Sequence, residues 1–380
     1  MNIAWILLAL VLAALLAAGV AGTRRNAQRR VRRPSVRTRP NSAREARLDG
    51  GAEADSPPPA PAQTPPALAA FCMLHADDAD PARITTLMEA IQRIPRPSRV
   101  LQQMLSPAWL EQATSTQLVE LISAEPLFAA EVLRAARSPL YGCRSPIASV
   151  GQAVTYLGLN TVNAIALQYL LKASFKSDSL ARAQALEHLW ATSAVAGELA
   201  QRMARYLGWP HPGASGCAVV LAFLGRVATM SAVSQGTLSK LPRAGTLARV
   251  EAEQAYVGLA CSEIGRLLMR RWDLPPQIVD DAADLERVLV TPAHALDASR
   301  APRLALGYFS ARLAEALTDG RLRDPRDFDR DDNATVDLFH LRGHAVRPAL
   351  TAALGSREVL SLARTLDAGR ASQRESAASA

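Results

Sequence analysis

The sequence TSTQLVELISAEPLFAAEVLRAARSPLYG (residues 114–142) predicts two short helices followed by a sharp turn. Thr114 or Ser115 can cap the first helix, because a hydroxyl oxygen accepts a hydrogen bond from an unpaired N–H of the first turn. Pro126 suits the first turn of the second helix, where its missing N–H costs no hydrogen bond. The residues SPLYG then interrupt the helical spacing of apolar side chains. The segment therefore indicates a helical fold with short connections.

The same spacing continues on both sides of this segment. From about residue 80 apolar residues recur at intervals of three and four, and no sustained alternation typical of a strand occurs. Aromatic residues make up only 5% of the chain, while alanine and leucine are abundant, as an all-α domain prefers. We therefore predict an all-α, multi-helix bundle. Its later helices are expected at 149–157, 161–175, 179–207, 216–234, 246–271, 275–290, 302–319 and 334–366.

The first 22 residues have the composition of a membrane anchor. Residues 3–21 contain no charged or polar side chain, and a helix of this length spans roughly 28 Å, about the thickness of the bilayer hydrocarbon. Residues 23–47 carry ten arginines and one glutamate, and such a basic flank is retained in the cytoplasm. We predict a single-pass anchor in the inner (cytoplasmic) membrane with the following chain cytoplasmic. A cleaved signal peptide is the alternative, and it is disfavoured because no basic residue precedes the apolar run.

The net charge of +8 belongs to the arginine-rich arm. Residues 23–47 contribute 10 − 1 = +9, so the rest of the chain sums to 8 − 9 = −1. The folded part therefore needs no basic face of the kind that binds duplex nucleic acid, and nucleic acid is not an expected partner. Inner-membrane lipid is the expected partner of the arm, since basic residues near an anionic surface each contribute about 1 kcal/mol. A role in topology alone stays open.

Composition also divides the chain into segments. Six prolines between residues 57 and 66 exclude a packed element there, because proline removes donors and fixes φ. The predicted organisation is a transmembrane anchor (1–22), an Arg-rich then Pro-rich disordered linker (23–68), a helical domain (80–290), a C-terminal helical extension (291–366) and a disordered tail (367–380). The sequence leaves open whether the extension is a separate subdomain or completes the first one.

Four segments resemble the HDOD domain family, the divergent relatives of HD-type metal-dependent phosphohydrolases. In chain order they are IPRPSRVLQQML (94–105), the segment 114–142 quoted above, IASVGQAVTYLGLNTVNAIAL (147–167) and EIGRLLMRRWDLPPQIVDD (263–281). The resemblance implies that residues 80–290 adopt an HDOD/HD-like bundle. It also implies a regulatory role in bacterial signal transduction.

The resemblance further implies that the metal site of the catalytic relatives is lost. HD hydrolases bind a divalent metal through histidines and an adjacent His-Asp pair, and the metal activates water. Where relatives have LLHDIGKL, this chain has LAFLGRVA (221–228), and no His-Asp dipeptide occurs anywhere in it. Alanine and phenylalanine cannot ligate a hard cation. We expect no enzyme activity, no metal and no cofactor. By the same resemblance Thr192 stands at the position of an upstream histidine, and Ala222 and Phe223 at those of the His-Asp pair. Cys261 stands at that of a later histidine, and Leu285 and Glu286 at those of a late pair of histidines. The candidate vestigial pocket comprises Thr192, Ala222, Phe223, Cys261 and Glu286.

Polar residues near the SPLYG turn form a candidate interaction surface. They are Arg137, Tyr141, Arg144 and Gln152. The leading interpretation is a membrane-tethered, catalytically inert signalling or scaffold module that contacts an unknown signalling protein. Two alternatives stay open. One is a metal-dependent phosphohydrolase with ligands from elsewhere, such as His188, His294, His340 or Asp280–Asp281. The other is a metal-free receptor that binds a nucleotide-type ligand in the vestigial pocket.

Overall fold

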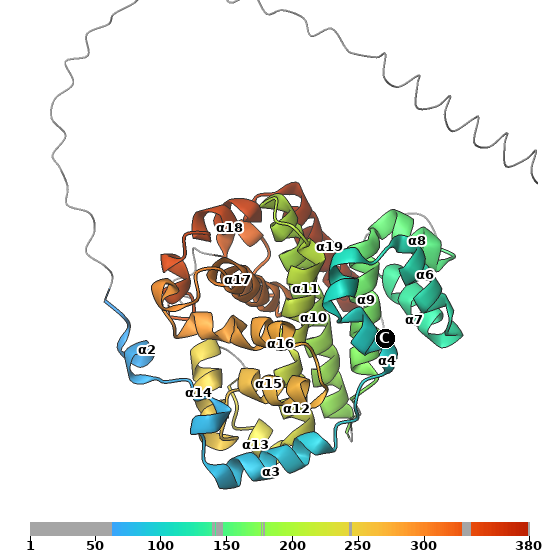
Figure 1. Cartoon of the computed structure of the whole chain (residues 1–380). Helices are drawn as coiled ribbons and strands as arrows, with labels where there is room; N and C mark the ends of the chain where they lie inside the picture. The colour runs from blue at the N-terminus through green and yellow to red at the C-terminus, as the bar shows by residue number, and fades with distance from the viewer. Residues whose placement is uncertain are drawn as a thin grey trace, which may run out of the picture. The chain divides into compact units, whose positions relative to one another are not determined.

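The computed structural model describes residues 63–138, 141, 147–175, 177, 179–242, 245–328 and 336–378. Contacts within this part of the chain form a single helical unit (Figure 1), and no strand occurs in the ranges just given. The predicted all-α class is therefore confirmed. The predicted anchor and most of the predicted linker, residues 1–62, lie outside the described residues.

The helices are short, apart from α10, α17 and α19. In chain order they are α2 (Pro66–Ala70), α3 (Pro81–Gln92), α4 (Arg99–Met104), α5 (Pro107–Gln112), α6 (Ser115–Ser123), α7 (Pro126–Ala136), α8 (Val150–Leu157), α9 (Leu159–Lys172), α10 (Leu180–Tyr206), α11 (Pro212–Ala222), α12 (Leu224–Ala232), α13 (Gln235–Leu238), α14 (Thr246–Tyr256), α15 (Cys261–Arg271), α16 (Pro276–Ala283), α17 (Ala301–Thr318), α18 (Arg347–Leu354) and α19 (Arg357–Ala378). Short 3₁₀ helices are η1 (Ala76–Asp78), η3 (Asp284–Leu289), η4 (Ala293–Ala295), η5 (Pro325–Asp327) and η7 (His340–Gly343).

Helix α10 is the centre of the bundle (Figure 1), where it packs against α9, α11 and α17. Apolar side chains along its length, from Leu186 to Ala204, are buried. The approach to α11 is close because Gly197 faces Gly216. A Cβ on Gly197 would lie 2.7 Å from a methyl carbon of Val220. The crossing of α10 and α11 therefore depends on the absence of a side chain at Gly197 as well as on the apolar area that the two helices bury.

Helices α6, α7 and α8 form a smaller group that packs on α9 (Figure 1). The hydroxyl of Thr114 caps α6, Pro126 occupies the first turn of α7, and the hydroxyl of Ser149 caps α8, so the predicted helix starts are confirmed. The Phe128 and Tyr169 rings stack with centroids 5.2 Å apart and join α7 to α9. Local capping signals thus define this group, and ring stacking attaches it to the bundle.

Residues beyond 291 complete the bundle. Helix α17 packs against α10, α11 and η3, and its Tyr308 and Phe309 are fully buried. Helices α18 and α19 pack on each other and on α10 and α17. The C-terminal extension therefore shares the core of the preceding helices, which answers the question that the sequence left open.

Three of the long predicted helices are divided. The segment 334–366 consists, where the structure describes it, of η7, α18 and the start of α19. The segment 246–271 is interrupted where Gly258 adopts a φ of 105°, a conformation that a side chain would disfavour. The Glu253 carboxylate then accepts a hydrogen bond of 2.9 Å from the Cys261 N–H and so caps α15. The segment 216–234 begins earlier than predicted, at Pro212, and is divided at Phe223 into α11 and α12.

Both predicted ends of the folded part are corrected. The linker was predicted to run to residue 68, but α2 begins at Pro66 and the Leu68 side chain is buried in the core. A disordered tail was predicted from residue 367, but α19 continues to Ala378. No proline or further glycine follows Gly369 to end that helix, and the alanines there favour it.

One described segment, Pro212–Ala232, is long and apolar enough to cross a membrane by length and composition. However, 61% of its most apolar window is buried inside the fold. The segment is also the pair of core helices α11 and α12 rather than one continuous helix. It is therefore accounted for as part of the bundle core.

The crossing of α12 and α15 provides a test of the packing. A Cβ on Gly225 would lie 1.8 Å from the Cys261 carbonyl oxygen, so Gly225→Ala forces the two helices apart. We expect the free energy of unfolding to fall by about 3 kcal/mol, as for a severe overpacking change. Urea unfolding measures it, with Gly236→Ala as the control, because a Cβ there meets no atom within 4 Å. Equal stability of the two variants would contradict the packing.

Candidate functional site

The residues of the candidate vestigial pocket come from four segments of the bundle. Thr192 lies on α10, Ala222 and Phe223 lie at the end of α11, Cys261 begins α15, and Glu286 lies in η3. All are buried except Ala222, which is partly buried. The site divides into an apolar part around Phe223 and a polar part around Cys261 and Glu286.

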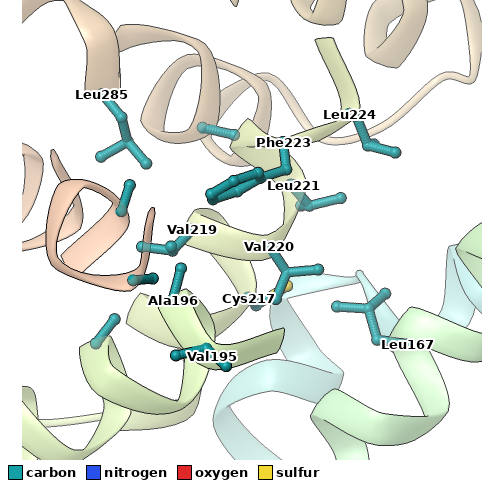
Figure 2. Close-up of a cluster of buried hydrophobic side chains, with 14 of the residues drawn as sticks. Leu167, Val195, Ala196, Cys217, Val219, Val220, Leu221, Phe223, Leu224 and Leu285 are labelled. Atoms are coloured by element: carbon teal, nitrogen blue, oxygen red, sulfur yellow. The ribbon is translucent and has the colours of Figure 1, made fainter. Parts of the chain in front are cut away.

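The apolar part is filled by side chains. Phe223, at the position of the family's His-Asp pair, lies among Val219, Ala196 and Leu285 (Figure 2). Leu285 in turn packs closely on Gly307 of α17, where a Cβ would lie 2.3 Å from a Leu285 methyl carbon. A packed apolar cluster therefore occupies positions at which the resemblance places metal ligands.

Thr192, at the position of an upstream histidine, uses its hydroxyl internally. Its Oγ1 lies 2.9 Å from the His188 carbonyl oxygen and 3.0 Å from the Thr318 Oγ1 on α17. Both contacts are hydrogen bonds, one along α10 and one between α10 and α17. The side chain therefore has a structural role in this fold.

The polar part is organised by Arg249 of α14. Its Nη1 lies 2.7 Å from the Glu253 Oε1 and 3.0 Å from the Cys261 Sγ, and its Nη2 forms an ion pair with Glu286. The Cys261 Sγ is 3.7 Å from the other Glu286 oxygen. A guanidinium cation thus contacts both Cys261 and Glu286, which stand at two positions where the resemblance places metal ligands. Although burial opposes its charge, Glu253 and Glu286 hold the pKa of Arg249 well above its ordinary value.

Two more arginines extend this arrangement. Arg226 of α12 forms an ion pair with Glu315 of α17, and Arg312 lies 3.0 Å from the other Glu315 oxygen. We call the whole set the buried charge cluster; its members are Arg226, Arg249, Arg312, Glu253, Glu286 and Glu315. Three positive and three negative charges sum to zero. The cluster therefore compensates its own charge. Its ion pairs join α14 to η3 and α12 to α17, and a hydrogen bond from Arg312 to the Thr246 hydroxyl connects the two sets.

The electrostatics keep Cys261 and Glu286 in opposite protonation states. Burial, together with Glu253 and Glu286, raises the pKa of the Cys261 thiol, so it stays protonated. A thiol is a much poorer nucleophile and metal ligand than a thiolate. Burial alone would raise the pKa of Glu286, but Arg249 and Arg312 outweigh it and lower that pKa to about 2. Glu286 is therefore ionised and paired at neutral pH.

The acidic residues kept as alternative metal ligands are also paired. The Asp280 Oδ1 lies 2.5 Å from the Arg266 Nη1, and the Asp281 Oδ1 lies 3.0 Å from the Arg300 Nε. His188 is half exposed, 3.4 Å from Asp319. Over the described part of the chain, no three His, Cys, Asp or Glu side chains are grouped as a metal ion would require. The geometry therefore offers no support for these residues as a ligand set.

Two residues of the candidate interaction surface form hydrogen bonds with other residues of the chain. The Arg137 Nε donates a hydrogen bond of 2.7 Å to the Ile147 carbonyl, and the Gln152 side chain accepts one of 2.7 Å from the Ala148 N–H. These two residues brace the connection between α7 and α8. Tyr141 lines a separate cleft, and Arg144 lies outside the described residues. Contact of this surface with a partner stays a prediction.

Arg249 and its partners were not among the residues predicted from the sequence. Arg249 and Glu253 are spaced i,i+4 on α14, and Arg312 and Glu315 are spaced i,i+3 on α17. Such pairs ordinarily occur on exposed helix faces. The available signal was the apolar surroundings of Arg312 in ALGYFSARLAEAL (305–317), which places a charged residue on a helix that is otherwise core.

Arg249→Met removes the central cation and is expected to lower the free energy of unfolding by about 3–5 kcal/mol, since it leaves buried carboxylates unpaired. In the wild type, ionised Glu286 adds to the free energy of unfolding above the ordinary pKa of 4.5, and this contribution is lost as the pH falls toward 2. In the variant burial raises the Glu286 pKa, so acidification from about pH 7 to about pH 4 should destabilise it less than the wild type.

Urea midpoints at the two pH values measure both effects. Arg249→Lys retains the charge without the planar fork and should fall between the wild type and the methionine variant. Arg96→Met is the control, since Arg96 and its partner Asp273 are 60% and 71% exposed, and we expect it to change the midpoint little. Wild-type stability of Arg249→Met would contradict the assigned role.

Comparison with known proteins agrees with this fold. The family model of the HDOD domain matches residues 94–287, more than half of the chain. No curated protein matches the chain. An HDOD domain protein of unknown function from Geobacter sulfurreducens is similar in structure, with 20% identity, a TM-score of 0.54, and coverage of 75% of this chain and 97% of that one.

Two further solved structures are similar. One, from Shewanella amazonensis SB2B, carries a provisional name as a phosphohydrolase and has 16% identity, a TM-score of 0.51, and coverage of 74% of this chain and 98% of that one. The other is the MmoQ response regulator from Methylococcus capsulatus str. Bath, with 22% identity, a TM-score of 0.31, and coverage of 69% and 98%. At these identities the two structures with TM-scores of 0.54 and 0.51 speak for the fold alone. The family match decides the assignment: the chain belongs to the HDOD domain family.

Proposed function

We propose that this chain is a membrane-tethered, catalytically inert HDOD module that acts in bacterial signal transduction through contacts with a signalling protein. The observation that carries the proposal is the contact of the Arg249 guanidinium with both Cys261 and Glu286. These are positions at which the resemblance places metal ligands. The family therefore contributes a scaffold here, and its hydrolytic site has become part of the core.

The chemistry of the cluster supports inertness. A divalent metal polarises a phosphoryl oxygen and lowers the pKa of a bound water, and a guanidinium, which donates hydrogen bonds and accepts none, cannot activate water in that way. The Arg249 donors already face Glu253, Cys261 and Glu286. Phe223 and Leu285 fill the neighbouring positions (Figure 2). A substrate phosphate would have to displace buried, paired groups to enter.

The membrane part of the proposal rests on the sequence. Residues 3–21 provide an apolar span, and the basic residues 23–47 favour a cytoplasmic, lipid-facing arm. A tether of this kind raises the effective concentration of a module toward a membrane-bound partner without any new contact. We place the helical domain in the cytoplasm, beside the inner membrane.

The purified full chain, prepared without chelator, should contain far less than one equivalent of iron, manganese, zinc or magnesium by mass spectrometry. It should not hydrolyse bis-p-nitrophenyl phosphate or cyclic dinucleotides when these metals are added, because the former ligand positions carry Phe223, Leu285 and Thr192. An active HD-type hydrolase in the same buffer is the positive control. Near-stoichiometric metal with phosphodiesterase activity would overturn the proposal in favour of a hydrolase.

Cross-linking in cells followed by capture of the C-terminally tagged chain tests the tether and the partner together. The full chain should fractionate with membranes at high salt, since an apolar span, unlike the basic arm alone, is not released by screening. It should recover the same signalling protein in repeated captures. Deletion of residues 1–22 should release the chain and reduce recovery, because the effective concentration falls. A soluble full chain would contradict the anchor, and repeated capture of no protein would contradict the scaffold role.

A further inference from the structure

A cleft separates α8 and α9 from the end of α10 and the start of α19. Its volume is about 360 Å³, within the range of small-molecule sites. The residues that matter for its chemistry are Tyr141, Tyr156, Arg202, Arg205, Arg357 and Glu358. It is lined by none of the residues of the buried charge cluster, so it is distinct from the former metal site.

Arg202 forms a fixed wall of this cleft. Its Nε lies 2.7 Å from the Glu198 Oε1, which neutralises its charge within α10. Its Nη1 donates hydrogen bonds to the Glu358 carbonyl at 2.7 Å and to the Ser361 Oγ at 3.2 Å. The start of α19 is thereby held against α10. The cleft is pre-organised, and little ordering is required of its walls when a ligand binds.

Two other arginines line the same cleft without hydrogen bonds or ion pairs of the kind that Arg202 forms. Arg205 lies in the last turn of α10 and Arg357 is the first residue of α19, and both are exposed. Neither side chain forms a hydrogen bond or ion pair with the part of the chain that the structure describes. Glu358, which carries one negative charge, also lines the cleft. The two arginines and one glutamate leave a net positive charge in the cleft, which favours binding of an anion.

Two tyrosines provide aromatic side chains in the same cleft. Tyr156 of α8 is 54% exposed, although it is a large aromatic side chain. Tyr141 lies deeper, where burial and the nearby Glu198 raise the pKa of its hydroxyl, which therefore stays neutral. An exposed aromatic face beside unpaired guanidinium groups can take a planar ring by stacking, while arginine pairs with phosphate through its fork of donors.

We propose that this cleft binds a nucleotide-sized aromatic phosphate, with Arg205 and Arg357 on the phosphate and Tyr156 against the ring. The ligand would bridge α8, α10 and α19 and so join the α6–α8 group to the C-terminal helices. Because it would bind the folded chain alone, it would raise the melting temperature. The proposal depends neither on the membrane anchor nor on the loss of the metal site, and its failure would leave both untouched.

Isothermal titration of the full chain with AMP, GMP and inorganic pyrophosphate tests the site. We expect saturable one-to-one binding of at least one nucleotide and a rise in melting temperature. Arg205→Gln/Arg357→Gln should weaken nucleotide binding by about tenfold or more, the loss that follows when charge-assisted hydrogen bonds to phosphate are removed. Tyr156→Ala should weaken nucleotide binding while leaving pyrophosphate affinity within about twofold, because pyrophosphate has no ring to stack.

The matched control is Arg96→Gln/Arg134→Gln, which removes two exposed arginines outside the cleft lining and changes the net charge equally. It should bind as the wild type does. An equal loss in this control would show non-specific charge attraction and overturn the proposal. So would the absence of binding for both nucleotides at concentrations on the order of 1 mM, or undiminished binding by the Arg205→Gln/Arg357→Gln variant. Unchanged urea midpoints verify that each variant is folded.

Discussion

The second half of this fold depends on the ion pair between Arg249 and Glu286 and on the charges around it. Removing an ion from water costs several kcal/mol, and only a well-placed partner offsets that cost. Arg249 is held by Glu253 on its own helix and by Glu286 in η3, while Arg226 and Arg312 share Glu315 of α17. The ion pairs hold α14 to η3 and α12 to α17, and neither pair of elements can separate without leaving a buried charge unpaired. The hydrogen bond from Arg312 to the Thr246 hydroxyl connects the two sets. These directional contacts constrain the arrangement of the four elements more strictly than apolar burial, which is not directional.

Under the proposed function, the same arrangement explains how the family fold can persist without hydrolytic chemistry. In HD hydrolases acidic and imidazole ligands converge on a divalent cation, and that cation offsets their mutual repulsion. In this chain Glu286 stands where the resemblance places a histidine ligand, and its charge is compensated by Arg249. Under the proposed function a guanidinium replaces the electrostatic role of the metal and lacks its Lewis acidity. Phe223 and Leu285 belong to the neighbouring apolar cluster (Figure 2), so the substitutions that would close the site also fill the core.

The parts of the fold that were predictable are those encoded by neighbouring residues. The starts of α6, α7 and α8 follow from Thr114, Pro126 and Ser149, whose capping or proline signals act within one turn. The break between α14 and α15 was missed because the spacing of apolar residues runs through it. That break needs the positive φ of Gly258 and the reach of Glu253 to Cys261. The buried charge cluster was missed for a similar reason, since its i,i+4 and i,i+3 pairs look like exposed ones until α17 covers them. The loss of the metal ligands, by contrast, is implied by the resemblance and stays a prediction.

The cleft beside α19 is formed by residues from inside and from outside the region that the family model matches. The family match ends at residue 287, whereas Arg357 and Glu358 lie on a helix that begins seventy residues later, at Arg357. One wall of the cleft, with Tyr156 and Arg205, comes from the matched region, and the other comes from outside it. Arg202 joins the two walls through the Glu358 carbonyl and the Ser361 hydroxyl. Recognition at this cleft would consequently be a property of this chain and of relatives that share its C-terminal helices, since the bundle common to the family supplies only half of the site.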